Sequence, residues 1–179
     1  PTGGGARGEA GGTQQPAGDL ASVRAVPGRI GRRPGEAKET AVAWRVALAA
    51  RDRPVALVFT RQDVPTLDRA QFAAAEGLQR GAYILADAPN ARPDLILIAS
   101  GSEVALIVAA RQKLLEKNLQ ARIVSMPSWE LFEDQPPEYR HAVLPPEVGA
   151  RLAVEAGVSR GWHRYFGTYG ALRAVDGFV

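Results

Sequence analysis

The chain has 179 residues, of which 46% are hydrophobic, so it can bury one complete core or one domain with part of another. It contains no cysteine, which excludes disulfides, thiolate metal sites and a cysteine nucleophile and permits an intracellular setting. The net charge is only +3 and no apolar run approaches the ~20 residues of a membrane span, so we expect contact with neither nucleic acid nor membrane.

The first 18 residues carry seven glycines, which predicts a loop rather than a packed element. They show neither the apolar core of a signal peptide nor the Arg/Ser pattern of a transit peptide, and we expect a cytoplasmic protein. Residues 19–26 predict a short helix that is capped by Asp19 and ended by Pro27 and Gly28.

The stretch "GRIGRRP" (28–34) stands between two predicted helices, where an α/β pattern requires a strand. Three arginines and two glycines around one isoleucine are too polar for a strand buried on both faces. We therefore expect a distorted or exposed strand. The arginines, Arg29, Arg32 and Arg33, indicate solvated charge or contact with a phosphorylated small molecule rather than a nucleic-acid site.

Residues 36–50 predict a helix with Thr40 near its start and an apolar side formed by Ala41, Trp44, Val46 and Leu48. The continuous apolar run "PVALVFT" (54–60) then predicts a buried parallel strand. A short polar helix follows at 68–79, which is either an interdomain connection or a surface hairpin arm.

The second half of the chain alternates strands with helices. Residues 102–117 predict a helix about 24 Å long that Ser102 caps, with Glu103 at its positive end. The predicted strands are 81–88, 94–100, 121–127 and 150–157, with a short helix in 136–148 and an aromatic turn at 161–167. This pattern predicts an α/β fold with a mostly parallel sheet and flanking helices.

The turn "SGSEV" (100–104) lies where open α/β sheets bind anions, at the carboxyl end of a strand and the start of a helix. It is not a GxGxxG motif and has no Walker lysine, and helix capping explains Ser102 and Glu103 better. His141 and His163 lie far apart without metal-spaced neighbours, so no metal site is predicted.

Four aromatic residues near the carboxyl end are expected to be packing anchors or subunit contacts rather than a cofactor platform: Trp129, Trp162, Tyr165 and Phe166. Arg61 is different, because "VALVFTRQ" places it at the carboxyl end of an apolar strand. Its guanidinium is suited to bidentate capture of phosphate. Spacing alone yields no Ser/His/Asp set and no carboxylate pair, so no catalytic residue is assigned.

Several strings together resemble the C-terminal third of transketolase. They are "LASVRAVPG", "ETAVAWRVAL", "PVALVFTRQDVPTLDR", "GAYILADA", "DLILIASGSEVALIVAARQKLLE", "ARIVSMPSWELFEDQPPEYRHAVLP" and "RLAVEAGVSRGWHRYFG". "SMPSWELFEDQ" followed by "YRHAVLP" favours transketolase over deoxyxylulose-phosphate synthase and the pyruvate dehydrogenase β chain, which share its architecture.

The resemblance implies a homodimer that uses thiamine diphosphate and magnesium to move a two-carbon ketol unit from a ketose phosphate to an aldose phosphate. Residues 1–68 would be an incomplete pyrimidine-binding domain, and residues 69–179 a C-terminal domain without its last elements. The diphosphate-and-metal domain, the glutamate that activates the cofactor and the aromatic pocket for its pyrimidine are expected before Pro1. This chain would therefore hold no cofactor or metal ligand and be inactive alone; the alternative is a non-catalytic assembly or binding module derived from transketolase.

By resemblance, Arg61 corresponds to a ligand of the sugar phosphate. The segment "GEAGGTQQP" (8–16) resembles the family's "GEDGPTHQP" and departs from it at substrate-contacting positions. Gln14 replaces a histidine that contacts a sugar hydroxyl, Ala10 replaces an aspartate that selects the donor's configuration, and Thr2 replaces a phosphate-binding histidine. Losing one hydrogen bond from a charged group, ~1.5–3 kcal/mol, would slow the reaction roughly 10- to 150-fold.

Overall fold

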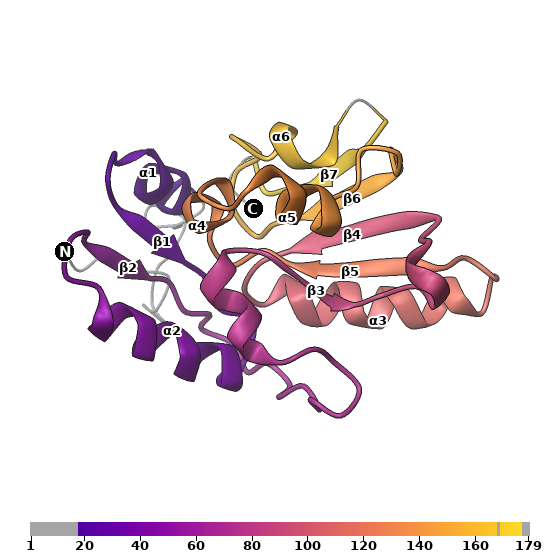
Figure 1. Ribbon diagram of the computed structural model, residues 1–179, viewed down its shortest axis with the longest axis horizontal. Helices are drawn as coiled ribbons and strands as arrows, with labels where there is room; N and C mark the ends of the chain where they lie inside the picture. The colour runs from indigo at the N-terminus through magenta and orange to yellow at the C-terminus, as the bar shows by residue number, and fades with distance from the viewer. Residues whose placement is uncertain (1–17, 168, 177–179) are drawn as a thin grey trace.

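Two β-sheets organise the protein, as the computed structural model in Figure 1 shows; it describes residues 18–167 and 169–176. A two-stranded sheet, β1 (Ile30–Arg32) beside β2 (Val55–Leu57), lies next to a five-stranded sheet of order β3-β5-β4-β6-β7. Among the described residues no strand of one sheet pairs with a strand of the other, although just beyond β1 the Arg33 N–H donates to the Pro127 carbonyl at 2.8 Å.

The five-stranded sheet is mostly parallel, as predicted. Its strands are β3 (Tyr83–Ala86), β4 (Leu95–Ala99), β5 (Ala121–Ser125), β6 (Arg151–Val154) and β7 (Ala171–Arg173). Only β3, at one edge, runs antiparallel to its neighbour β5. In the centre, Leu97 of β4 pairs with Ile123 of β5 and with Leu152 of β6.

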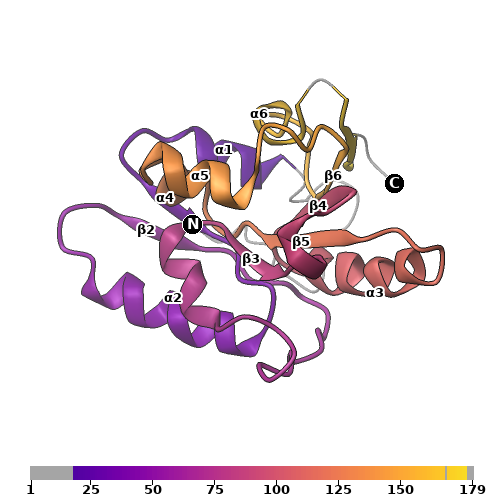
Figure 2. The ribbon, with the colours of Figure 1, turned by 45° about the vertical axis from the view of Figure 1, so that its right-hand side comes forward.

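Helices cover both faces of this sheet, which confirms the α/β class (Figures 1 and 2). Helix α3 (Glu103–Leu115) lies on one face, and α4 (Trp129–Glu133), α5 (Pro137–Val143) and α6 (His163–Phe166) lie on the other. The apolar run of β4 is buried because its side chains enter the cores on both sides, Ile98 towards α4 and Leu97 towards α3. None of the described helices has the length and apolar character to cross a membrane.

The amino-terminal unit consists of α1 (Asp19–Ala25), β1, α2 (Ala37–Ala49) and β2, with Ile30 of β1 paired in parallel with Val55 of β2. Two 3₁₀ helices follow, η2 (Ala75–Arg80) and η3 (Pro89–Ala91). Helix α2 and η2 share a small core made of Val42, Ala43, Ala75 and Leu78. This core attaches the amino-terminal unit to the chain that leads into the second sheet.

The predicted apolar side of α2 was wrong except at Val46, which is partly buried and packs against the small core. Trp44 and Leu48 are 50% and 72% exposed, whereas Glu39, Val42 and Ala43 are the buried residues. The buried face follows the i, i+3, i+4 spacing but includes a carboxylate, because the surface that it meets is partly polar. Counting apolar residues therefore selected the wrong side of this helix. Trp44 instead stacks on Phe59 at a centroid distance of 6.1 Å.

The predicted distorted or exposed strand in "GRIGRRP" was also wrong. All three residues of β1 are buried and pair regularly with β2. Arg33, which follows β1, is tolerated as a buried arginine because the carboxylates of Glu103 in α3 and Glu155 after β6 neutralise it. Arg32, 2% exposed, has no such partner, since its Nε and Nη1 atoms are buried without a hydrogen bond.

Three further expectations need correction. Gly18, not Asp19, occupies the N-cap position of α1, so Asp19 lies in the first turn. The strand predicted at 54–60 is only three residues long and partly buried, since it belongs to a two-stranded sheet. The polar helix predicted at 68–79 is a turn followed by η2, whose Leu78 is fully buried.

Candidate functional site

Arg61 lies in an exposed loop after β2, whose last residue is Leu57 and not residue 60 as predicted. The Thr60 hydroxyl donates to the Gln62 carbonyl at 3.2 Å and turns the chain at this point. Within the described residues, no carboxylate lies within ion-pair distance of the Arg61 guanidinium and no group accepts a hydrogen bond from it. As far as the described residues go, its donors are open to an anion at the carboxyl end of the two-stranded sheet.

Gln14, together with Ala10 and Thr2, lies outside the described residues. The structure therefore does not bring Gln14 and Arg61 together or separate them. The predicted substrate contact of Gln14 stays a prediction.

The carboxyl end of β4 is occupied by Arg33. Its Nη1 donates to the Ser100 carbonyl at 3.0 Å and contacts the Glu103 carboxylate at 2.5 Å. Gly101, with φ of 59°, makes room for it, since a Cβ there would lie 2.6 Å from the Arg33 Cζ. The "SGSEV" turn thus holds a cation of the chain itself.

Ser102 does occupy the predicted cap position, but its hydroxyl donates to Glu103 at 2.6 Å instead of capping the helix.

Glu155, which follows β6, is the buried centre of this network and is 2% exposed. Its carboxylate contacts Arg33 and accepts from Arg24 at 3.0 Å and from the Trp162 indole N–H at 3.3 Å. Burial lowers the pKa of Arg24, while the charge of Glu155 acts in the opposite direction. The Arg24 guanidinium also lies 3.8 Å from the centre of the Trp129 ring. Glu155 therefore connects α1 and β1 to the second sheet.

A second buried network surrounds Glu39 of α2. Its carboxylate accepts from the Tyr83 hydroxyl at 2.6 Å, the Ser125 hydroxyl at 2.7 Å and the Gly35 N–H at 2.7 Å. Burial, followed by the charge of Glu39, raises the pKa of Tyr83. This network connects α2 to β3 and β5.

Glu36 extends the same interface. Burial opposes its charged form, but hydrogen bonds from Arg69 and from backbone N–H groups together lower its pKa. Its carboxylate also accepts from the Leu67 N–H at 3.4 Å.

These buried carboxylates were not singled out from the sequence. Glu155 could have been found, because it directly follows the apolar strand "RLAV" at its carboxyl end. Glu39 could not, since its spacing within α2 does not distinguish it from a solvated helix residue.

The prediction that the aromatic residues near the carboxyl end are packing anchors is confirmed. Trp129, Trp162 and Tyr165 are buried in one core, with the two tryptophan rings 5.1 Å apart in an edge arrangement. Phe166 packs against that core.

His141 and His163 are exposed, and in 18–167 and 169–176 no group of three or more His, Asp or Glu could hold a metal ion.

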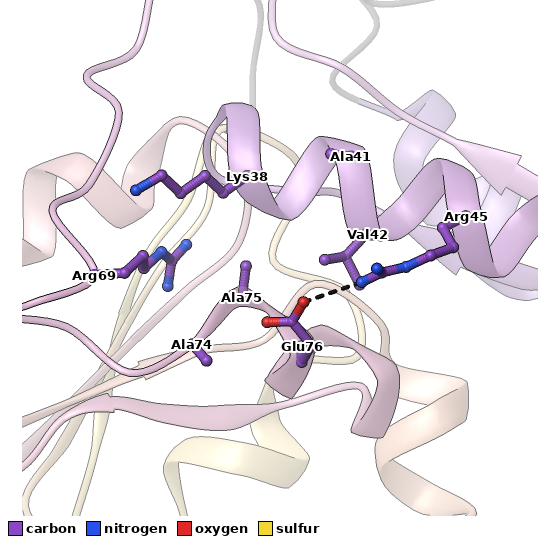
Figure 3. A pocket seen from close by; sticks show the side chains of 8 residues that line it. All are labelled: Lys38, Ala41, Val42, Arg45, Arg69, Ala74, Ala75 and Glu76. Carbon is purple, nitrogen blue, oxygen red and sulfur yellow. Dashed lines mark hydrogen bonds and ion pairs between the residues drawn. The ribbon is translucent and has the colours of Figure 1, made fainter.

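A hollow of about 360 Å³ lies between α2 and the segment that ends in η2 (Figure 3). Lys38 and Arg69 stand at one end of it, and at the other Arg45 reaches from α2 to Glu76 at 3.0 Å. Arg69 is paired with Glu36, and the Lys38 ammonium donates to the Leu67 carbonyl at 3.3 Å. Because the chain itself engages these cations, this hollow is a weaker anion site than the Arg61 loop.

Two family descriptions match the chain in sequence order. "Transketolase, pyrimidine binding domain" matches residues 2–66 and "Transketolase-like TK C-terminal domain" matches residues 81–178. The transketolase of Geobacillus stearothermophilus is 50% identical over 171 residues, which are 96% of this chain and 26% of that protein.

Solved structures agree with these sequence matches. The chain matches a transketolase from Leishmania mexicana with a TM-score of 0.84 and 40% identity, over 94% of this chain and 24% of that one. It matches a Pichia stipitis transketolase in complex with sedoheptulose-7-phosphate with a TM-score of 0.85 and 33% identity, over 98% and 25%. The chain thus spans about a quarter of the length of these proteins.

Proposed function

The chain belongs to the transketolase family, and from this we propose that it forms the C-terminal part of an enzyme that transfers a two-carbon ketol unit from a ketose phosphate to an aldose phosphate. The observation that carries the proposal is the match of both family descriptions, in order, to residues 2–66 and 81–178. The division at about Asp68, with a partial pyrimidine-binding domain before it and the C-terminal domain after it, is part of the proposal. So are a homodimer and a cytoplasmic location.

We assign to Arg61 the binding of the sugar phosphate. Its exposed guanidinium lies beyond the carboxyl end of β2, and no described residue engages it. A charge-assisted, bidentate contact with a phosphate is worth about 1.5–3 kcal/mol. The same contact would bind the donor and the acceptor in turn, because each substrate carries a phosphate.

Thiamine diphosphate and magnesium belong to the proposed complete enzyme, where the cofactor supplies the carbanion chemistry. The described residues do not fit the cofactor's diphosphate and metal, because the carboxylates at the sheet ends are already engaged by Arg24, Arg33 and Tyr83. We therefore assign both groups to parts of the enzyme that this chain does not span. The described residues contribute substrate binding and the interface between the two sheets.

The test is a chimera in which this chain replaces the matching quarter of the Geobacillus stearothermophilus transketolase. With thiamine diphosphate, magnesium, xylulose 5-phosphate and ribose 5-phosphate, we expect measurable ketol transfer by the chimera and none by the chain alone. Arg61→Gln should raise KM for both phosphorylated substrates at least about tenfold. Arg92→Gln changes an exposed arginine that follows η3 and is the matched control.

Two results would contradict the proposal. A folded, cofactor-binding chimera without any ketol transfer would remove the catalytic assignment. An unchanged KM in the Arg61 variant would remove the phosphate role but leave the family function standing.

A further inference from the structure

A second cavity, of about 340 Å³, lies between α4, α5, β6 and α6, far along the chain from Arg61. Three arginines and one carboxylate line it, together with the exposed His141: Arg140, Arg151, Arg164 and Glu133. The three arginines and the one carboxylate give this lining an excess of two positive charges. Such an excess around a hollow of this size favours a small anion.

The positively charged guanidinium of Arg151 is held in a fixed position by hydrogen bonds. Its guanidinium donates to the carbonyls of Val148 at 2.8 Å, Tyr165 at 3.0 Å and Pro145 at 2.7 Å. Carbonyls orient the guanidinium but do not neutralise it. Burial lowers the pKa of Arg151, and only the charge of Glu147 opposes this effect. The wall of the cavity therefore keeps a fixed cation without a carboxylate in contact.

Arg140 and Arg164 retain unused donors. Arg140 contacts Glu133 through Nη1 at 3.1 Å, and its buried Nε has no hydrogen-bond partner. Arg164 lies 3.6 Å from the same carboxylate, too far for a good hydrogen bond. Glu133 also accepts from the Tyr165 hydroxyl at 3.0 Å, so one carboxylate serves two guanidiniums and a phenol. The side chains of Arg140 and Arg164 are 36% and 55% exposed, so donors that Glu133 does not engage are open to solvent.

We propose that this cavity binds a phosphate group, either free or carried by a small phosphorylated metabolite, with Arg140 and Arg164 as direct donors and Arg151 as the fixed charge behind them. The guanidinium plane matches the tetrahedral oxygens of phosphate in a bidentate way. A phosphate would offer both arginines the oxygens that Glu133 alone cannot provide. The site belongs to the second sheet and is separate from the loop that carries Arg61.

The experiment is a calorimetric titration of the full chain with inorganic phosphate, in an Arg61→Ala background that removes the other proposed phosphate contact. We expect one saturable site. Replacing Arg140 and Arg164 together with glutamine should weaken binding at least about tenfold, while Arg92→Gln should leave it unchanged. At tenfold excess over Kd, phosphate should raise Tm by roughly 3–5 °C.

Glu133→Gln tests the proposal in the opposite direction. It removes the competing negative charge but keeps an acceptor for the Tyr165 hydroxyl, so phosphate should bind more tightly. This variant decides the question if the double arginine variant does not fold. Absence of saturable binding, or an affinity that neither variant changes, would overturn the proposal.

A parallel titration with ribose 5-phosphate distinguishes the two sources of the phosphate group. At least about tenfold tighter binding than inorganic phosphate, lost in the double arginine variant, would identify a phosphorylated metabolite. Equal affinities would identify free phosphate.

Discussion

The Tyr83 hydroxyl on β3 donates a 2.6 Å hydrogen bond to the Glu39 carboxylate on α2. This contact crosses the interface between the two sheets, and both side chains are buried. Because Glu39 also accepts from Ser125 and Gly35, the carboxylate is buried with its acceptors in use. The interface between the two units is therefore polar and specific in its geometry.

This contact predicts an alkaline loss of stability. The pKa of Tyr83 is raised in the folded protein by burial and by Glu39. Above the ordinary tyrosine value of about 10, the unfolded chain has released a proton that the folded chain keeps, so stability falls as pH rises. Below that pH the contribution is fully present. Urea unfolding between pH 8 and pH 11 should show this decline, and Tyr83→Phe should make it shallower. The same slope in wild type and variant would contradict the assignment, and Tyr169→Phe, at a residue 86% exposed, is the control.

Removing the charge of Glu155 should be strongly destabilising. Its side chain is fully buried against Arg24 and Arg33, and Glu155→Gln would leave the buried Arg24 without its ion-pair partner and Arg33 with Glu103 alone. We expect a loss of about 3–5 kcal/mol in the free energy of unfolding. Thermal unfolding followed by circular dichroism measures it. Glu76→Gln, in the exposed pair with Arg45, should leave Tm almost unchanged. Equal effects of the two variants would show that Glu155 does not compensate these arginines.

Arg32 offers a prediction of the opposite sign. It is 2% exposed, two of its nitrogens have no hydrogen-bond partner, and burial followed by the nearby Arg53 lowers its pKa. Arg32→Met keeps most of the volume and removes a charge that costs desolvation free energy without compensation. The variant should be more stable by about 1 kcal/mol or more. A lower Tm in Arg32→Met would mean that the guanidinium has a partner that we have not identified. Arg53→Met, at an exposed ion pair with Asp134, is the comparison.

The sequence predicted β3, β4, β5 and β6 because each is a short apolar run between turn residues, as in "DLILIAS" and "ARIVSMP". It did not predict β7, whose three residues, Ala171–Arg173, are not an apolar run. It failed where burial depends on partners far along the chain. Arg33 is tolerated in the interior because Glu103 in α3 and Glu155 after β6 contact it, and neither contact can be inferred from local spacing. The same holds for Glu39, whose partner Tyr83 lies 44 residues away. Arg61 follows the strand as predicted only in order along the chain, because β2 ends at Leu57 and not at residue 60.

Gly81 should be among the least replaceable residues. Its φ is +83°, and a Cβ would lie 2.2 Å from the Phe132 nitrogen and 2.4 Å from the Ser128 carbonyl oxygen. Both are backbone atoms that cannot rotate away, so Gly81→Ala should cost about 4 kcal/mol or more. Gly28 also has a positive φ, +73°, but has open space around it. Gly28→Ala should therefore show the dihedral strain alone, about 1–2 kcal/mol. Similar costs for the two variants, measured by urea unfolding, would contradict the steric argument.

Restoring the family's residues at Gln14 and Ala10 should increase the activity of the enzyme. By resemblance to the family, Gln14 stands for a histidine and Ala10 for an aspartate, both contacts of the sugar. Glutamine can donate a hydrogen bond but cannot become charged, and alanine can do neither. In the chimera, Gln14→His and Ala10→Asp together should raise kcat/KM for xylulose 5-phosphate at least about tenfold, because two interactions with the donor return. The gain should need Arg61, so the same pair of changes with Arg61→Gln should recover much less. An unchanged kcat/KM in the double variant would mean that these positions do not reach the substrate.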